Sequence, residues 1–308
     1  MPEELEMSKP IYLPFADGQW RLAMGLKPLQ LHDWIEIDAD FADQLTLKTQ
    51  LLAQRYSDVF ASIPGSEAGQ REVMDLLVEH LIRHFPQYDQ LQGDRLLNQV
   101  TGQVWHLADF EANPLDLAGR LVQEDLCLML PGDNGYVLAA ASVCFPLRWR
   151  LREKLGHPME QIHQHVPGYA DQLDRPVGHF FDRLKPDYPC YRLNWGIVDA
   201  PDLFLDQGKG KEEFDSTITS ENAGERLWLR VERQTLRRLE ISSGILFTIR
   251  TYVYPLYTLA DDSMVVRNLA AAIQQIPTAM QVYKNLLPIR TALLSYLERG
   301  GAQSTANF

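Results

Sequence analysis

The sequence predicts an α+β protein in which helices from both ends of the chain flank one antiparallel sheet. Before residue 125 and after residue 262, apolar residues recur at helical spacing, whereas strand-like runs fill the stretch from 126 to 249. The turn sequence PGDNG separates the first two of these runs and is typical of a hairpin loop. The sheet is therefore expected at about residues 125–252 of a single domain spanning 1–299.

Helices are expected first along the chain. Apolar residues at helical spacing indicate two of them, with Leu45, Leu47, Leu51, Leu52 and Tyr56 in one and Val73, Met74, Leu77 and Leu81 in the other. His80 and His84 stand four residues apart on the second helix, where they could clamp a metal ion. They also continue its apolar side, which favours histidines at the border of the core.

Strands follow in the middle of the chain. Five runs predict four or five strands: LCLML, YVLAAASVCF, YRLNWGIV, LWLRVE and ILFTIRTY. The polar segment 206–225 reads as a surface loop inside the domain. Residues 262–299 return to helical spacing, and residues 300–308 are expected to form a flexible tail.

Composition narrows the classes of function. The chain of 308 residues has 29 Lys and Arg against 41 Asp and Glu, a net charge of −12 that disfavours nucleic acid as a partner. Its three cysteines have no CxxC spacing, so reduced thiols are expected rather than disulfides or a thiolate zinc site. No apolar stretch is long enough to span a membrane, and no targeting segment is recognisable, which predicts a cytoplasmic protein without membrane contact.

Common nucleotide, hydrolase and metal signatures such as GxGxxG, GxSxG and HExxH are missing from the sequence. One alternative source of chemistry is the histidine-rich stretch His157 to Gly168, in which VPG follows His163 and His165. A neutral imidazole on a rigid loop could ligate haem iron or another metal. The other interpretation is that these histidines hydrogen-bond to backbone carbonyls.

Strand alternation separates further polar residues. Arg192 and Asn194 fall on the face opposite Tyr191 and Trp195, where they could hold a carboxylate or simply face solvent. Arg233 has the same strand parity as the apolar residues that end with Val231, so its guanidinium is expected to point toward the core.

A buried Arg233 needs a partner, which is either Glu232, another carboxylate or an anionic ligand. Arg250 is a further candidate for binding an anion, because its parity is opposite to that of its apolar neighbours on the strand. Glu124 and Asp125, just before the first strand, could orient a cationic amine or cap a turn.

Together, these segments resemble a known family. The ordered set QEDLCLML, VCFPLRW, EKLG with IHQHVPG, RLNW, and ERQTLRRL with FTIRTY is similar to the haem-dependent oxidative N-demethylases. The resemblance spans roughly Leu26 to Leu256. It rests on the order of the motifs, since each short motif alone is weak evidence.

The resemblance implies a haem b bound on a PAS-like antiparallel sheet, with His163 as the iron ligand and His165 as the second choice. It also implies that Arg192, Asn194, Arg233 and Arg250 contact the cofactor, and that Glu124, Asp125 or Glu232 attracts a cationic amine. The expected reaction is oxidative N-demethylation of a small methylated amine such as dimethylamine, with O2 as oxidant and formaldehyde as product. Because the chain has no cysteine set for an iron–sulfur cluster, electrons are expected from a separate flavin and iron–sulfur reductase.

Two other functions fit the same fold. A haem-binding sensor or carrier would bind the cofactor without turnover. A haem-free binding module would keep the fold alone, with His163 and His165 as ordinary loop residues.

Overall fold

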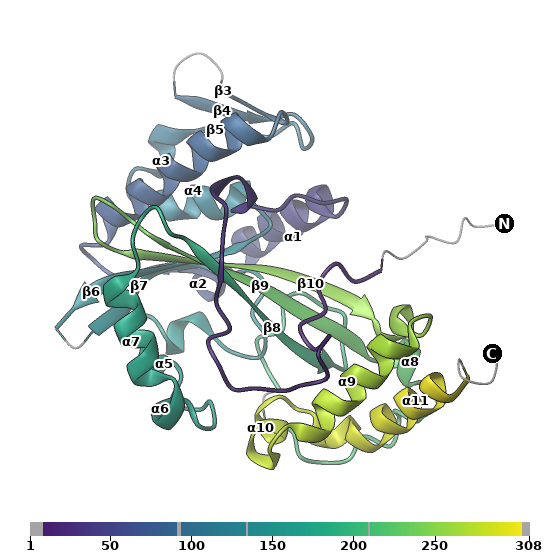
Figure 1. Ribbon diagram of the computed structural model, residues 1–308. Helices are drawn as coiled ribbons and strands as arrows, with labels where there is room; N and C mark the ends of the chain where they lie inside the picture. Colours follow the sequence, from purple (N-terminus) through teal and green to yellow (C-terminus); the bar gives the residue numbers. More distant parts are fainter. Residues whose placement is uncertain (1–8, 91–93, 134, 209, 304–308) are drawn as a thin grey trace.

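The computed structural model describes residues 9–90, 94–133, 135–208 and 210–303. Its centre is a seven-stranded sheet with the order β1-β8-β9-β10-β6-β7-β2, in which all neighbours are antiparallel (Figure 1). The strands are β1 (Lys27–Pro28), β2 (Phe60–Ser62), β6 (Asp125–Gly132), β7 (Gly135–Ser142), β8 (Cys190–Val198), β9 (Trp228–Arg238) and β10 (Ile245–Pro255). The α+β prediction is confirmed.

All five predicted runs form strands, β6 to β10. Gly132 pairs with Gly135 across the predicted hairpin between β6 and β7. The prediction of four or five strands was too low, because β1 and β2 complete the sheet at its two edges. These strands have two and three residues, too few for an alternating pattern to be visible in the sequence.

The two predicted N-terminal helices form, as α1 (Phe41–Gln54) and α3 (Glu67–His84). Tyr56, which the sequence placed in the first of them, instead begins the separate short helix α2 (Tyr56–Val59), and α4 (Pro114–Leu121) was not predicted. The sequence did not predict the three-stranded antiparallel sheet of β3 (Tyr88–Gln90), β4 (Arg95–Asn98) and β5 (Val104–His106) between α3 and α4. α4 packs closely on β7, because a Cβ atom added at Gly119 would lie 2.1 Å from the Ser142 hydroxyl. Glycine is therefore required there.

Three short helices lie between β7 and β8: α5 (Met159–Ile162), α6 (Tyr169–Gln172) and α7 (Asp174–Arg183). The predicted loop 206–225 is confirmed up to the start of α8 (Ala223–Arg226), except for residue 209, which lies outside the described part of the chain. The C-terminal helices are α9 (Ser263–Gln275), α10 (Thr278–Tyr283) and α11 (Arg290–Gln303). Short 3-10 turns are η1 (Leu31–Asp33), η2 (Leu107–Phe110), η3 (Leu151–Glu153), η4 (Leu256–Leu259) and η5 (Leu287–Ile289).

Helix α11 continues beyond residue 299, where the sequence placed the end of the domain. Residues 304–308 of the expected tail lie outside the described part of the chain. The assignment of 1–299 to one domain stays a prediction. Within the described ranges, no helix combines the length and apolar character needed to cross a membrane.

The two faces of the main sheet carry different residues, and we name them face A and face B. Strand register places Leu229, Val231, Arg233, Arg250 and Tyr252 on face A, and Arg192, Asn194, Glu232, Gln234 and Phe247 on face B. Face A is packed at both ends, since one apolar cluster joins α1, α3 and α4 to Leu126 and Leu246, and a second joins α9 to α11 to Leu229 and Val231. On face B, Phe181 of α7 packs with Leu236 and Ile245.

Candidate functional site

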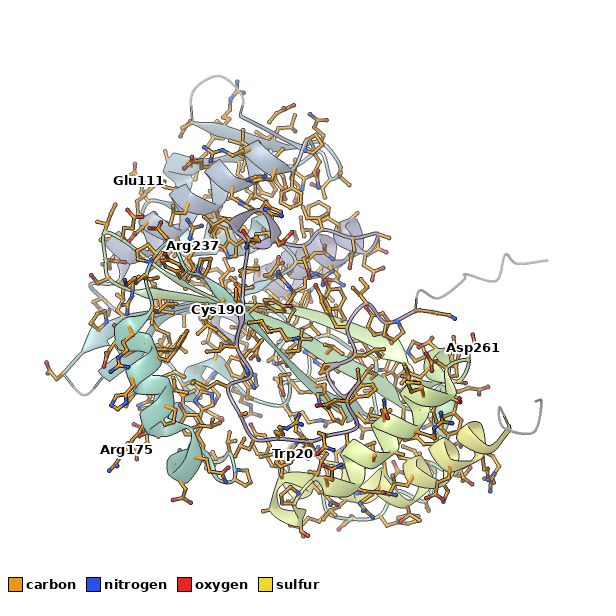
Figure 2. The ribbon with its side chains drawn as sticks, in the orientation of Figure 1. Trp20, Glu111, Arg175, Cys190, Arg237 and Asp261 are labelled. Atoms are coloured by element: carbon orange, nitrogen blue, oxygen red, sulfur yellow. The ribbon has the colours of Figure 1, made fainter. Side chains whose placement is uncertain are left out.

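An extended N-terminal segment runs along the sheet and contacts both faces. We call residues 9–38 the N-terminal strap; it contains β1 and η1. In Figure 1 the strap is the dark purple chain that passes in front of β8, and in Figure 2 its Trp20 lies at the lower edge of the molecule, near α10. Three arginines that the sequence analysis singled out, Arg192, Arg233 and Arg250, contact residues of the strap.

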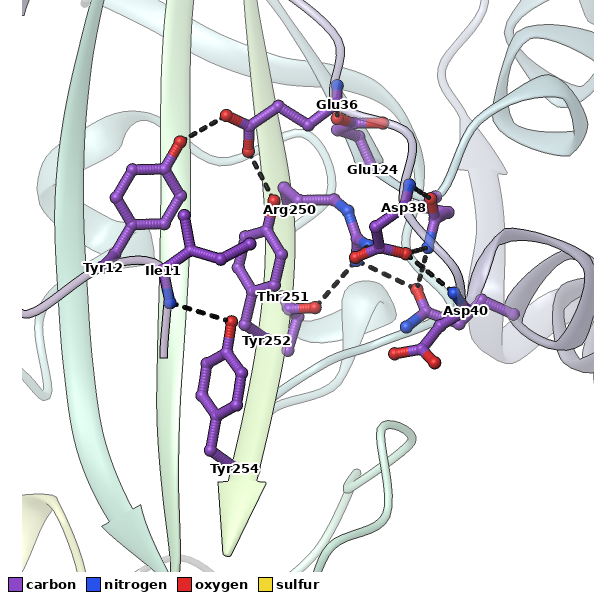
Figure 3. A network of polar contacts seen from close by, with 12 residues as sticks. Ile11, Tyr12, Glu36, Asp38, Asp40, Glu124, Arg250, Thr251, Tyr252 and Tyr254 are labelled. Carbon is purple, nitrogen blue, oxygen red and sulfur yellow. Dashed lines mark hydrogen bonds and ion pairs between the residues drawn. The ribbon is translucent and has the colours of Figure 1, made fainter. Parts of the chain in front are cut away.

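On face A, carboxylates of the strap bind the predicted arginines Arg233 and Arg250; Figure 3 shows the contact of Arg250 with Asp38 and the contacts of Glu36 with Tyr12 and Tyr252. Arg233 Nε lies 3.1 Å from Glu36 Oε1, and the Arg233 guanidinium also donates to the carbonyls of Asp33 and Trp34. The hydroxyls of Tyr12 and Tyr252 donate to Glu36. The partner of Arg233 is thus Glu36; Glu232, one of the predicted partners, lies on the opposite face.

Arg250 has a similar set of contacts. Its side chain is fully buried, it forms an ion pair with Asp38, and it donates to Gln44 Oε1 at 3.0 Å. Its guanidinium also stacks on the Tyr252 ring, 4.5 Å from the centroid. We call Glu36, Asp38, Arg233 and Arg250 the face A latch, because these ion pairs tie the strap to the sheet.

Glu124 and Asp125 are both fully buried, and both accept hydrogen bonds from backbone N–H groups. Glu124 accepts a hydrogen bond from the backbone N–H of Glu36 at 3.0 Å. Asp125 accepts from the N–H groups of Cys144 and Phe145 at 2.8 and 2.9 Å. Burial raises the pKa of both carboxyls. These contacts favour the turn-capping alternative over the binding of an amine.

Face B carries a different polar cluster, centred on Glu232. Asn194 Nδ2 and Gln234 Nε2 donate to Glu232 Oε2 at 3.2 and 2.9 Å. Arg230 Nε is 4.0 Å from Oε1, the other carboxylate oxygen. Arg192 Nη1 donates to Gln234 Oε1 at 3.0 Å. Arg192 and Asn194, predicted as a pair, are thus brought together with Glu232 and Gln234 into one hydrogen-bonded group, the face B cluster.

A few side chains of face B are less completely buried than those of face A. Phe247 and Val253 on β10 and Glu232 on β9 are only half-buried, although these strands lie in the interior of the sheet. On face A of the same strands, Leu246, Arg250 and Tyr252 are buried. Ile249 and Thr251, which lie between Phe247 and Val253 on the same face, are buried. Half-buried apolar side chains next to a few polar groups are compatible with a ligand-binding surface.

The strap also reaches the face B cluster. Arg192 Nε donates to the backbone oxygen of Met24 at 2.7 Å, and Nη2 donates to that of Ala23 at 3.3 Å. One residue earlier, Leu22 is close to Gly168: a Cβ atom added there would lie 3.0 Å from Leu22 Cδ2. Residues 22–24 thus connect the polar cluster to the loop that follows His163.

His163 lies at the C-terminal end of α5, whose residues Met159 and Ile162 pack on the apolar cluster of face B. Its Nδ1 atom is 2.9 Å from the backbone oxygen of Met159, and its ring stacks on Tyr169 with a centroid distance of 4.6 Å. Gly168 provides the positive φ of 79° that starts α6. The half-buried ring of His163 is therefore held in one orientation.

The remaining histidines have different surroundings. His165 is exposed, whereas His157 is half-buried. His80 is buried against Trp34 and is next to His84, as expected for the border of the core. Among the described residues, no group of three or more His, Cys, Asp or Glu side chains is arranged to hold a metal ion.

Sequence reasoning missed several residues of this region. Gln234 follows Glu232 at the same parity on β9 and was detectable from the alternation. Lys284, which donates to the backbone oxygen of Trp195 at 2.7 Å, and Tyr169 gave no comparable signal. Lys284 follows α10, which only the tertiary fold brings to β8, and Tyr169 begins α6, whose fold places its ring against His163.

Comparison with known protein families gives one match that covers most of the chain. The family described as "Haem-dependent oxidative N-demethylase, alpha subunit-like" matches residues 25–294. This range contains the face B cluster and the His163 loop, and strap residues 22–24, which contact both, lie just before it.

Proposed function

Because the chain belongs to the haem-dependent oxidative N-demethylase alpha subunit-like family, we propose that it demethylates a small methylated amine such as dimethylamine. The methylated amine, O2, two electrons and two protons would give the demethylated amine, formaldehyde and water. The match over residues 25–294 is the observation that carries this proposal. Electrons would come from a separate flavin and iron–sulfur reductase.

The side chains near face B fit a haem group. A haem iron needs only one or two protein ligands, because the porphyrin provides four nitrogens. With the Nδ1 hydrogen of His163 donated to the Met159 carbonyl, the lone pair of the neutral ring lies on Nε2, the atom that would bind iron. Phe247 and Val253 provide apolar surface for a flat ring, and Arg192 is a cation for a propionate.

When bound, haem supplies the binding and activation of O2. The contribution of the protein is to hold the amine. Glu232 Oε2 accepts two amide hydrogen bonds, which fix the carboxylate in place, and Oε1, 4.0 Å from Arg230 Nε, would accept a hydrogen bond from an N–H group of a protonated amine. Half-burial strengthens such an ion pair relative to one in water.

Four further points belong to this proposal. The sheet would be PAS-like, with haem b on face B. Residues 1–299 would act as one domain, since strap, sheet and C-terminal helices share contacts. The location would be cytoplasmic. Arg233, Arg250, Glu124 and Asp125 would stabilise the fold rather than contact the cofactor or substrate, because the strap and backbone groups occupy them.

The test is an absorption spectrum of protein expressed with adequate haem supply, before and after dithionite and then with dimethylamine. A Soret band that shifts with the amine, followed by formaldehyde formation in proportion to reductant consumed, is the expected result. A haem band that responds to diatomic ligands but never gives product contradicts the proposed reaction and identifies a sensor or carrier. Folded protein without haem contradicts the proposal altogether.

A further inference from the structure

The groups around the face B cluster have an excess of positive charge. Arg192, Arg230 and Lys284 are cations, and Glu232 is the carboxylate whose charge acts on all three. Asp125 is also near Arg230, but Lys48 lies 3.7 Å from Asp125 Oδ1 and balances its charge. Three cations thus share one carboxylate in a region that is largely removed from water.

The three cations are held by neutral acceptors. Arg192 donates to Gln234 and to the carbonyls of Ala23 and Met24. Arg230 donates to the carbonyls of Asp202, Leu203 and Phe145, and its buried Nε atom has no hydrogen-bond partner. Lys284 donates to the carbonyl of Trp195. These contacts satisfy hydrogen bonds without neutralising charge, which is unfavourable for cations taken out of water.

Lys284 shows the effect of this excess. Its pKa is lowered to about 8, because the lowering by burial, to which Arg192 adds, outweighs the opposite effect of Glu232. An anion bound beside Lys284 would remove this penalty and keep the ammonium charged.

Resting on the haem-dependent function proposed above, we propose that Arg192 and Lys284 form a carboxylate-binding subsite at the edge of β8. Arg192 lies on β8 itself, and Lys284 reaches the same strand from the end of α10 through the Trp195 carbonyl. A carboxylate accepts charge-assisted hydrogen bonds from both cations. It has two possible sources, a haem propionate or a carboxylate on the amine substrate.

The test compares Lys284→Gln with wild type, since glutamine keeps a donor for the Trp195 carbonyl and removes the charge. Lys185→Gln, at an exposed lysine, is the matched control, and Lys284→Arg should restore wild-type behaviour. The rate of haem transfer to apomyoglobin is measured for haem b and for haem dimethyl ester. Binding of N-methylglycine and of dimethylamine is measured by titration. Arg192→Gln replaces Lys284→Gln if the latter does not fold.

If a propionate is the occupant, Lys284→Gln should release haem b about tenfold faster, the size expected for one charge-assisted hydrogen bond, and should not affect the dimethyl ester. If the substrate carboxylate is the occupant, haem release should be unchanged and the Kd of N-methylglycine alone should rise. Haem release and both Kd values equal to those of Lys185→Gln would overturn the subsite and leave the proposed function standing.

Wild-type protein that binds no haem contradicts the proposed function instead. The subsite is then decided by calorimetric titration of N-methylglycine into the haem-free protein. A Kd that rises in Lys284→Gln supports the subsite, whereas no binding, or an equal Kd in both proteins, overturns it.

Discussion

The Nδ1 atom of His163 lies 2.9 Å from the backbone oxygen of Met159, one helical turn earlier. This contact sets the tautomer of the ring, and stacking on Tyr169 sets its plane. This ring could provide the iron ligand proposed above, because a neutral imidazole that donates from Nδ1 carries its lone pair on Nε2.

If His163 ligates the haem iron as proposed, His163→Ala should lower haem retention at least about tenfold, because a protein ligand to the iron contributes strongly to haem binding. His165→Ala is the matched control, because His165 is exposed two residues further along the same loop. The measurement is Soret absorbance per protein, with far-UV circular dichroism to verify folding. A normal Soret band in folded His163→Ala would remove His163 as the ligand.

Glu232→Gln should weaken binding of a protonated amine about tenfold while haem is retained. The glutamine oxygen can still accept from Asn194 and Gln234, so the substitution removes the charge and keeps the hydrogen bonds. The measurement is the Kd from amine-induced changes in the Soret band. Glu240→Gln, at an exposed carboxylate near the end of β9, should have no effect. Equal Kd values in the two variants would exclude Glu232 as the amine-binding group.

Arg250→Met should lower the free energy of unfolding by about 3 kcal/mol, because it leaves Asp38 and Gln44 without their buried partner. The haem content of the folded fraction should stay at the wild-type level, since Arg250 lies on face A. Urea denaturation measures the free energy of unfolding, and the Soret absorbance measures the haem content. Arg21→Met, which breaks an exposed ion pair with Asp17, should cost less than about 1 kcal/mol. A stable Arg250→Met variant that loses haem would contradict this prediction and show that Arg250 contributes to haem binding.

Strand alternation predicted more of the site than any other sequence feature. It separated Arg192 and Asn194 from Tyr191 and Trp195, and it turned Arg233 toward the core, as observed. The side of a strand residue is fixed by its position in the pleat, so the sequence contains this information.

The partners of these residues could not be predicted in the same way. Glu36 contacts Arg233 because the strap folds back over face A, a contact between segments 197 residues apart in the sequence. Lys284 is near Glu232 because α10 ends beside β8. Such contacts depend on tertiary packing between segments distant in the sequence, for which neither spacing nor alternation carries a signal.

The stability of the protein should depend on pH through His80. The ring is buried against Trp34, and burial lowers its pKa to about 4, with His84, Arg237 and Arg83 acting in the same direction. The unfolded chain has an ordinary histidine pKa of about 6.5. The neutral form is therefore favoured by folding, and its contribution is complete above about pH 6.5 and is lost as the pH falls toward 4.

Wild type should lose about 2 kcal/mol of stability between pH 7 and pH 5 through this one group. His80→Phe keeps an aromatic ring against Trp34 and cannot titrate, so its stability should fall less over the same interval. Urea denaturation at both pH values measures the difference between the two proteins, which cancels the titration of all other groups. His179→Phe, at an exposed histidine of α7, should follow wild type. Parallel pH curves for wild type and His80→Phe would mean that His80 accepts a proton in the folded state without cost.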